Sequence, residues 1–149
     1  MKKITKTTKK TAKVVKKTTA KKKESIDLFA HVSMLSEFPW KGDFKSLPAN
    51  QTYKMEITYP LHHPATVKVK TGKSGMGLIG LLNTIGKTYG KIYQEEEEAA
   101  GVPEQSETMY NRRTTDGPHG IWGHDIGDLV IEGITIDHQS KKIGLFIGS

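Results

Sequence analysis

The 149-residue chain contains no cysteine, and this absence excludes several kinds of chemistry. Without thiols the protein has no disulfide bond, no thiolate metal site and no cysteine nucleophile. No apolar run approaches the roughly 20 residues of a transmembrane helix, and the N-terminus lacks the apolar centre of a secretory signal. We therefore expect a soluble, intracellular protein with no transmembrane segment.

Acidic residues are absent from the N-terminal end of the chain. The first 23 residues contain 11 lysines and no Asp or Glu, whereas the other 126 residues contain 12 basic and 16 acidic residues. The net charge of +7 therefore combines a strongly basic tail with a mildly acidic body. Because the tail has few large apolar residues, burial cannot offset the entropy of ordering it. We predict a disordered tail over residues 1–23 and a single domain over residues 24–149.

The basic tail predicts binding to nucleic acid. Lysines neutralise phosphates without reading bases, so this binding would be electrostatic and independent of sequence. The same composition also suits an organellar targeting peptide, a segment that contacts an anionic membrane surface, or a solubilising tail. The predicted nucleic-acid contacts are Lys2, Lys3, Lys6, Lys9, Lys10, Lys13, Lys16, Lys17, Lys21, Lys22 and Lys23, together with Arg112 and Arg113.

Arginine is scarce, and the chain's two arginines are adjacent. Arg112 and Arg113 lie in a polar stretch, residues 101–120, that shows no apolar periodicity. A guanidinium group matches the geometry of phosphates and carboxylates. We predict that this loop is a second anion-binding element, and the alternative is a mobile connection without a ligand.

Alternating apolar and polar residues predict four strands. Residues 53–59 and 65–71 alternate cleanly and predict an antiparallel pair joined by a short loop. Residues 129–136 and 143–147 predict two further strands, the first with a β-bulge at Glu132-Gly133 that returns its apolar residues to one face. The outer face of the first pair carries Lys, Glu and Thr and no aromatic residue, which argues against an RNA-binding sheet that stacks bases.

Helical periodicity begins near Met76 and ends at Gly101. The apolar positions form one stripe, Leu78, Leu81, Leu82, Ile85, Tyr89 and Ile92. Ser74 is the predicted N-cap, and Glu95–Glu98 are predicted to form a solvated, fraying end or to contact the Lys-rich tail. A shorter helix is predicted over residues 25–35. The expected fold is α+β: a small antiparallel sheet of about four strands in ββαββ order, packed by one long helix.

Gly75, Gly77 and Gly80 match the G-x-G-x-x-G spelling of dinucleotide-binding proteins. The preceding strand alternates with lysines, whereas a dinucleotide-binding strand is buried on both faces and reads as an apolar run. We interpret these glycines as sites of close helix packing and predict no cofactor.

Three functions follow from these patterns. The first is a non-enzymatic nucleic-acid-associated protein, and the second is a protein-interaction or oligomerisation module whose tail serves targeting or solubility. The third is a small metal-dependent hydrolase that uses His119, His124, Asp125 and Asp128. The spacing of these residues matches no established zinc pattern, so we assign no catalytic residue and no metal ligand. His62 and His63 are predicted to lie in a surface loop.

Overall fold

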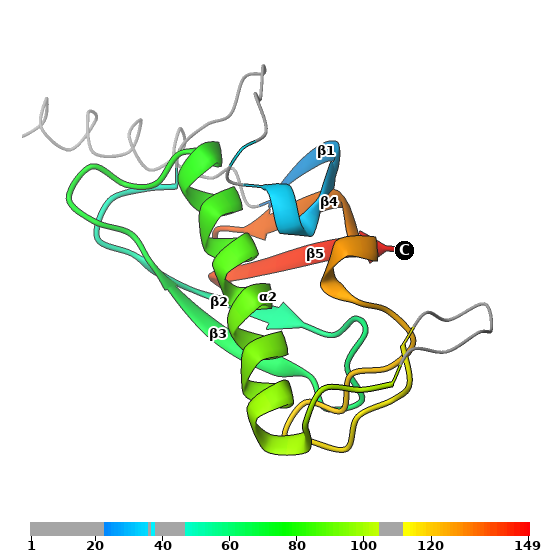
Figure 1. The fold of residues 1–149 in the computed structure, drawn as a ribbon. Coiled ribbons are helices and arrows are strands. Elements are labelled where there is room, and N and C mark those ends of the chain that lie inside the picture. Colours follow the sequence, from blue (N-terminus) through cyan, green and yellow to red (C-terminus); the bar gives the residue numbers. More distant parts are fainter. Residues whose placement is uncertain (1–22, 36, 38–46, 105–111) are drawn as a thin grey trace, which may run out of the picture.

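A five-stranded sheet with one long helix across one face forms the body of the protein (Figure 1). A computed structural model describes residues 23–35, 37, 47–104 and 112–149. The strands are β1 (Lys23–His31), β2 (Thr52–Ile57), β3 (Ala65–Lys70), β4 (Val130–Asp137) and β5 (Lys142–Gly148), and the long helix is α2 (Leu78–Ala100). Two 3-10 turns, η1 (Val32–Met34) and η2 (Ile126–Asp128), complete the elements of the described residues.

The sheet is mixed, in the order β1-β4-β5-β2-β3. Neighbouring strands are antiparallel except β5 and β2, which run parallel. The predicted α+β class is confirmed, but the expected four antiparallel strands in ββαββ order are wrong in detail. The additional strand is β1, and it joins the sheet beside β4 at one edge.

β1 occupies a segment for which the sequence predicted a helix. Ile26, Phe29 and Val32 have helical spacing, yet Leu28 and Ala30 are buried and Phe29 is 68% exposed. Pairing with β4 from Lys23↔Asp137 to His31↔Val130 overrides the helical pattern. Lys23, predicted to belong to the tail, is the first residue of this strand, while residues 1–22 lie outside the described residues.

The β2–β3 hairpin is confirmed as predicted. Its register runs from Thr52↔Lys70 to Ile57↔Ala65. Tyr53, Met55 and Ile57 are fully buried beneath α2, while the residues between them face the opposite side of the sheet. The strand alternation therefore separates a core face from a polar face.

The bulge predicted in β4 is also confirmed. The pairing of β4 with β5 shifts register between Ile131 and Gly133. As a consequence Ile131, Ile134 and Ile136 are all fully buried although their spacing is irregular.

The helix α2 begins later than the sequence predicted. Its N-cap is Gly77, without a side-chain hydrogen bond, so Ser74 does not cap it. The reason is a tight turn held by Leu47, whose N–H donates to the Met76 carbonyl and whose carbonyl accepts from the Met76 N–H. Gly75 has a φ of +75°, and a side chain there would collide with the Leu47 carbonyl. Gly101 ends the helix with a φ of +81°, as predicted.

Candidate functional site

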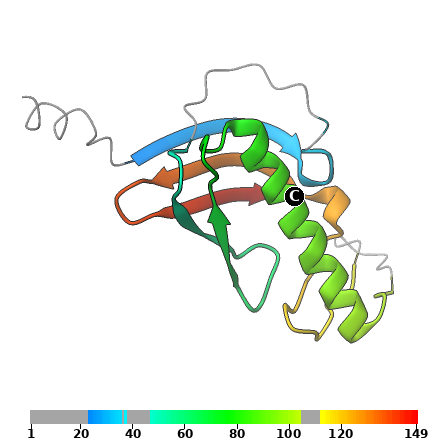
Figure 2. The ribbon, with the colours of Figure 1, turned by 90° about the vertical axis from the view of Figure 1, so that its left-hand side faces the viewer.

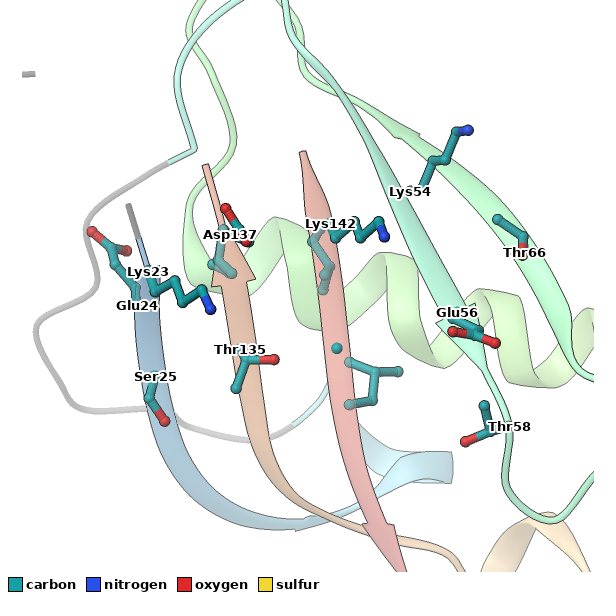
Figure 3. Close-up of a pocket in the computed structure, with 14 residues that line it drawn as sticks. Lys23, Glu24, Ser25, Lys54, Glu56, Thr58, Thr66, Thr135, Asp137 and Lys142 are labelled. Carbon is teal, nitrogen blue, oxygen red and sulfur yellow. The ribbon is translucent and has the colours of Figure 1, made fainter. Parts of the chain in front are cut away.

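The face of the sheet opposite α2, here called the open face, carries a groove of about 910 Å³ (Figure 3). No other element of the described residues packs on it, and Figure 2 shows α2 on the other side of the strands. Most of the residues that line the groove are polar or charged. Its lining comprises Lys23, Glu24, Ser25, Lys54, Glu56, Thr58, Thr66, Thr135, Ile136, Asp137, Lys142, Ile143, Gly144 and Leu145.

Charged residues form one continuous row across all five strands of the open face. Successive strands oppose Lys23 to Asp137, Asp137 to Lys142, Lys142 to Lys54 and Lys54 to Lys68. We call these five residues the lysine row. Figure 3 shows the first four of them side by side at one end of the groove. Neighbouring strands lie about 4.8 Å apart, so the row is about 19 Å long.

The single acid of the lysine row is already engaged. Asp137 Oδ1 accepts hydrogen bonds from the N–H groups of Gln139 and Ser140 at 3.0 and 3.1 Å. Hydrogen bonds from Ser140 hold the pKa of the Asp137 carboxyl below its ordinary value, and Lys23 adds to this effect. The carboxylate therefore caps the turn between β4 and β5.

Lys142, Lys54 and Lys68 are consecutive in the row and have no acid between them. All three are exposed, and none forms an ion pair with a carboxylate of the described residues. Like charges that face each other on adjacent strands are destabilising. This arrangement concentrates three positive charges on the open face, while Glu56 lies two residues along β2 from Lys54.

Aromatic residues lie farther along the open face. Phe146 of β5 is 57% exposed. Its Cδ2 lies 3.2 Å from the position that a Cβ atom on Gly133 would occupy. The ring therefore packs over the bare backbone of β4. Phe29 of β1 projects from the same face, because Leu28 and Ala30 on either side of it point into the core. Neither ring lies on the β2–β3 pair, and neither was predicted from the sequence to lie on this face.

A second site is built around Glu96, near the C-terminal end of α2. Glu96 is fully buried, and its carboxylate accepts hydrogen bonds from five groups. The donors are the Thr115 hydroxyl (2.6 Å) and the N–H groups of Gly117 (3.1 Å), His119 (2.8 Å), Gly120 (3.2 Å) and Ile121 (3.2 Å). The prediction of a solvated helix end is therefore wrong at this residue.

The charge on Glu96 survives its burial. Burial raises the pKa of the carboxyl, but the hydrogen bonds from Thr115, His119, Ile121 and Gly117 outweigh this effect and bring it to about 2. The signal was present in the sequence, since Glu96 follows Tyr89 by seven residues and Ile92 by four, and so continues the buried stripe. The absence of a side chain at Gly117 leaves room for the carboxylate beside this loop.

Two tyrosines of α2 hold the loops on either side of this carboxylate. Tyr89 donates its hydroxyl to the Tyr59 carbonyl at 2.9 Å, and Tyr93 donates to the His124 carbonyl at 2.7 Å. Burial raises the pKa of both hydroxyls. The end of α2 that extends past the sheet is thus an anchor for the loops drawn beside it in Figure 2.

The two predicted arginines differ in their surroundings. Arg112 is 3% exposed, with its Nη1 3.3 Å from Asp125 Oδ1 and 3.8 Å from Glu97 Oε1, and it lies over the Tyr93 ring. Arg113 is exposed and lies 3.8 Å from Glu104. Both guanidinium groups therefore contact carboxylates, and the role of these residues in nucleic-acid binding stays a prediction.

The structure separates the histidines of the predicted His/Asp cluster. His119 Nε2 lies 3.0 Å from Glu95 Oε2, whereas His124 Nε2 lies 3.1 Å from Ser149 Oγ, which in turn lies 2.7 Å from the Tyr59 hydroxyl. Among the described residues, no three His, Asp or Glu side chains are grouped so that they would hold a metal ion. His62 and His63 lie in an exposed loop, as predicted, where their N–H groups donate to the carbonyls of Gly120 and His119.

No protein-family model, curated protein or solved structure matches this chain. Within the residues that the structure describes, no helix has both the length and the apolar character required to cross a membrane.

Proposed function

We propose that this chain is a non-enzymatic nucleic-acid-associated protein that binds the phosphate backbone through its Lys-rich N-terminal tail. The observation that carries the proposal is the concentration of 11 lysines, without an acid, in residues 1–23 of a chain whose remainder has more acidic than basic residues. The last of these lysines, Lys23, is also the first member of the lysine row. The tail therefore joins the body at a surface that also carries positive charge.

Affinity in this proposal arises from the release of counterions. Each phosphate neutralised on a duplex contributes about −0.9 to the slope of log K against log salt concentration. Engagement of about six phosphates gives a slope near −5. Binding is independent of sequence, because ammonium–phosphate contacts carry no base information.

Fluorescence anisotropy with a random DNA duplex and an RNA strand, between 50 and 300 mM salt, tests this function. The full-length chain is compared with a full-length variant in which the ten lysines from Lys2 to Lys22 are replaced by glutamine. Micromolar binding with a steep salt dependence is expected for the wild type, and its loss is expected in the variant. A variant that binds as tightly as the wild type would refute the role of the tail.

A second candidate function, a protein-interaction or oligomerisation module, is favoured by the edges of the sheet. β1 and β3 are its edge strands, and each has one side without a strand partner among the described residues. Such an edge can add a strand from another chain. Light scattering coupled to size exclusion tests this function, which requires an assembly that persists in the glutamine-tail variant.

A further inference from the structure

We propose that the open face of the sheet binds a single-stranded nucleic acid, with its phosphates along the lysine row and a base stacked on Phe146. This inference rests on the proposed function and names the part of the body that shares the ligand with the tail. The prediction against base stacking concerned the outer face of β2 and β3, whereas Phe146 lies on β5.

The lysine row places three like charges on adjacent strands, and Glu56, two residues from Lys54 on β2, is a neighbouring acid in the same groove. Lys142, Lys54 and Lys68 face one another in register on three adjacent strands, and the one acid of the row is held in a turn. Folding places these like-charged residues opposite one another on adjacent strands, at a cost in free energy. A polyanion that crosses the strands offsets this repulsion at all three positions, whereas a small anion reaches fewer of them.

The lysine row is continuous in sequence with the basic tail. Lys23 ends the basic segment of the sequence and opens the lysine row, where it is paired in register with Asp137. A nucleic acid held by the tail is therefore presented to the row at high effective concentration, because the two elements are covalently joined. Lys23, Asp137, Lys142 and Lys54 of the row line the groove together (Figure 3).

An exposed aromatic ring lies beyond the lysine row on the open face. Phe146 lies four residues after Lys142 on β5, which places it about 13 Å away along the strand. Between Lys142 and Phe146, Gly144 has no side chain, and the Thr135 side chain packs over its backbone. The surface of the sheet is therefore low between the lysine and the ring. The exposed ring offers a face on which an unpaired base can stack. Bases in a duplex are already stacked on each other, so Phe146 favours a single strand.

The charge part of the proposal is tested in the full-length chain with a labelled oligo-dT strand. The variant Lys54→Gln/Lys68→Gln removes two charges from the row, and Lys87→Gln/Lys91→Gln removes two exposed charges from α2 on the other side of the sheet. For a single strand each lost contact lowers the salt slope by about 0.7, so the row variant is expected to lose about 1.4. The helix variant is expected to keep the wild-type slope.

The stacking part is tested with Phe146→Leu, which still covers Gly133 but removes the aromatic face. Oligo-dT binding is expected to weaken about fivefold or more, while binding of a duplex is expected to stay unchanged. Equal slopes for the row and helix variants, or unchanged oligo-dT binding by Phe146→Leu, would overturn the inference and leave tail-driven binding intact. A wild-type chain that binds no nucleic acid would remove the proposed function and this inference together.

Discussion

At the scale of the residue, Glu96 is a buried charged group at the C-terminal end of α2. The C-terminal end of a helix disfavours negative charge, and burial disfavours it further. Five hydrogen-bond donors compensate for both effects, four of them from the backbone between Gly117 and Ile121. A side chain on Gly117 would collide with the carboxylate. Glu96 therefore determines the path of this loop.

We expect Glu96→Gln to lower the free energy of unfolding at pH 7 by about 3 kcal/mol, because an amide places donors against backbone donors and carries no charge. Urea unfolding monitored by circular dichroism measures the change. Glu98→Gln is the matched control, since Glu98 is exposed and, among the described residues, accepts its hydrogen bond from Gln94. Equal stability of the two variants would contradict this account of the loop.

The lowered pKa of Glu96 also predicts that the stability of the protein depends on pH. The folded-state pKa of Glu96 is about 2, below its ordinary value of 4.5. Its contribution to stability is therefore complete above pH 4.5 and is lost as the pH falls toward 2, a difference of about 3 kcal/mol. Urea midpoints measured from pH 7 to pH 2 should converge for the wild type and Glu96→Gln. Parallel curves would show that the carboxylate is not the group that titrates.

At the scale of the element, β1 shows two periodicities in competition. The helical spacing of Ile26, Phe29 and Val32 and the strand spacing of Ile26, Leu28 and Ala30 share residues, so sequence alone does not separate them. Pairing with β4 buries the strand set and exposes Phe29. A strand buries Leu28 and exposes Phe29, whereas a helix buries Phe29. The two interpretations therefore make opposite predictions for substitutions of these adjacent residues.

Leu28→Ala is expected to lower the free energy of unfolding by about 2–3 kcal/mol, because it removes buried methyl groups and leaves a cavity. Phe29→Ala, the matched substitution on the exposed side, is expected to change it by less than about 0.5 kcal/mol. Thermal or urea unfolding of the two variants decides between strand and helix. A larger loss for Phe29→Ala would support the helix and contradict the fold.

At the scale of the whole molecule, the basic tail and the acidic end of α2 carry opposite charges, which would favour a contact between them. Each of the four acids at this helix end, Glu95–Glu98, has a partner within the body. Glu95 lies beside His119 and Lys91, Glu97 is 3.8 Å from Arg112, Glu98 accepts from Gln94, and Glu96 is buried. The hydrogen bond from His119 holds the pKa of Glu95 below its ordinary value. We therefore expect the tail to bind an external ligand rather than this helix end.

Replacing the tail lysines with glutamine is accordingly expected to leave amide hydrogen exchange unchanged over residues 95–98. The peptides that cover β2 and β3 serve as an internal reference, because their backbone hydrogen bonds are remote from this helix end. Faster exchange at residues 95–98 in the glutamine-tail variant would show that the tail folds back onto the helix end.

The sequence by itself determined the hairpin of β2 and β3, the bulge of β4, the apolar stripe of α2 and the division into basic tail and acidic body. These features depend on the order of neighbouring residues, which fixes periodicity and local charge. Only the tertiary structure decided that residues 23–31 form a strand, that Glu96 is buried and that the lysine row crosses the sheet. The row joins residues from Lys23 to Lys142, and their alignment exists only after strands distant in sequence have paired.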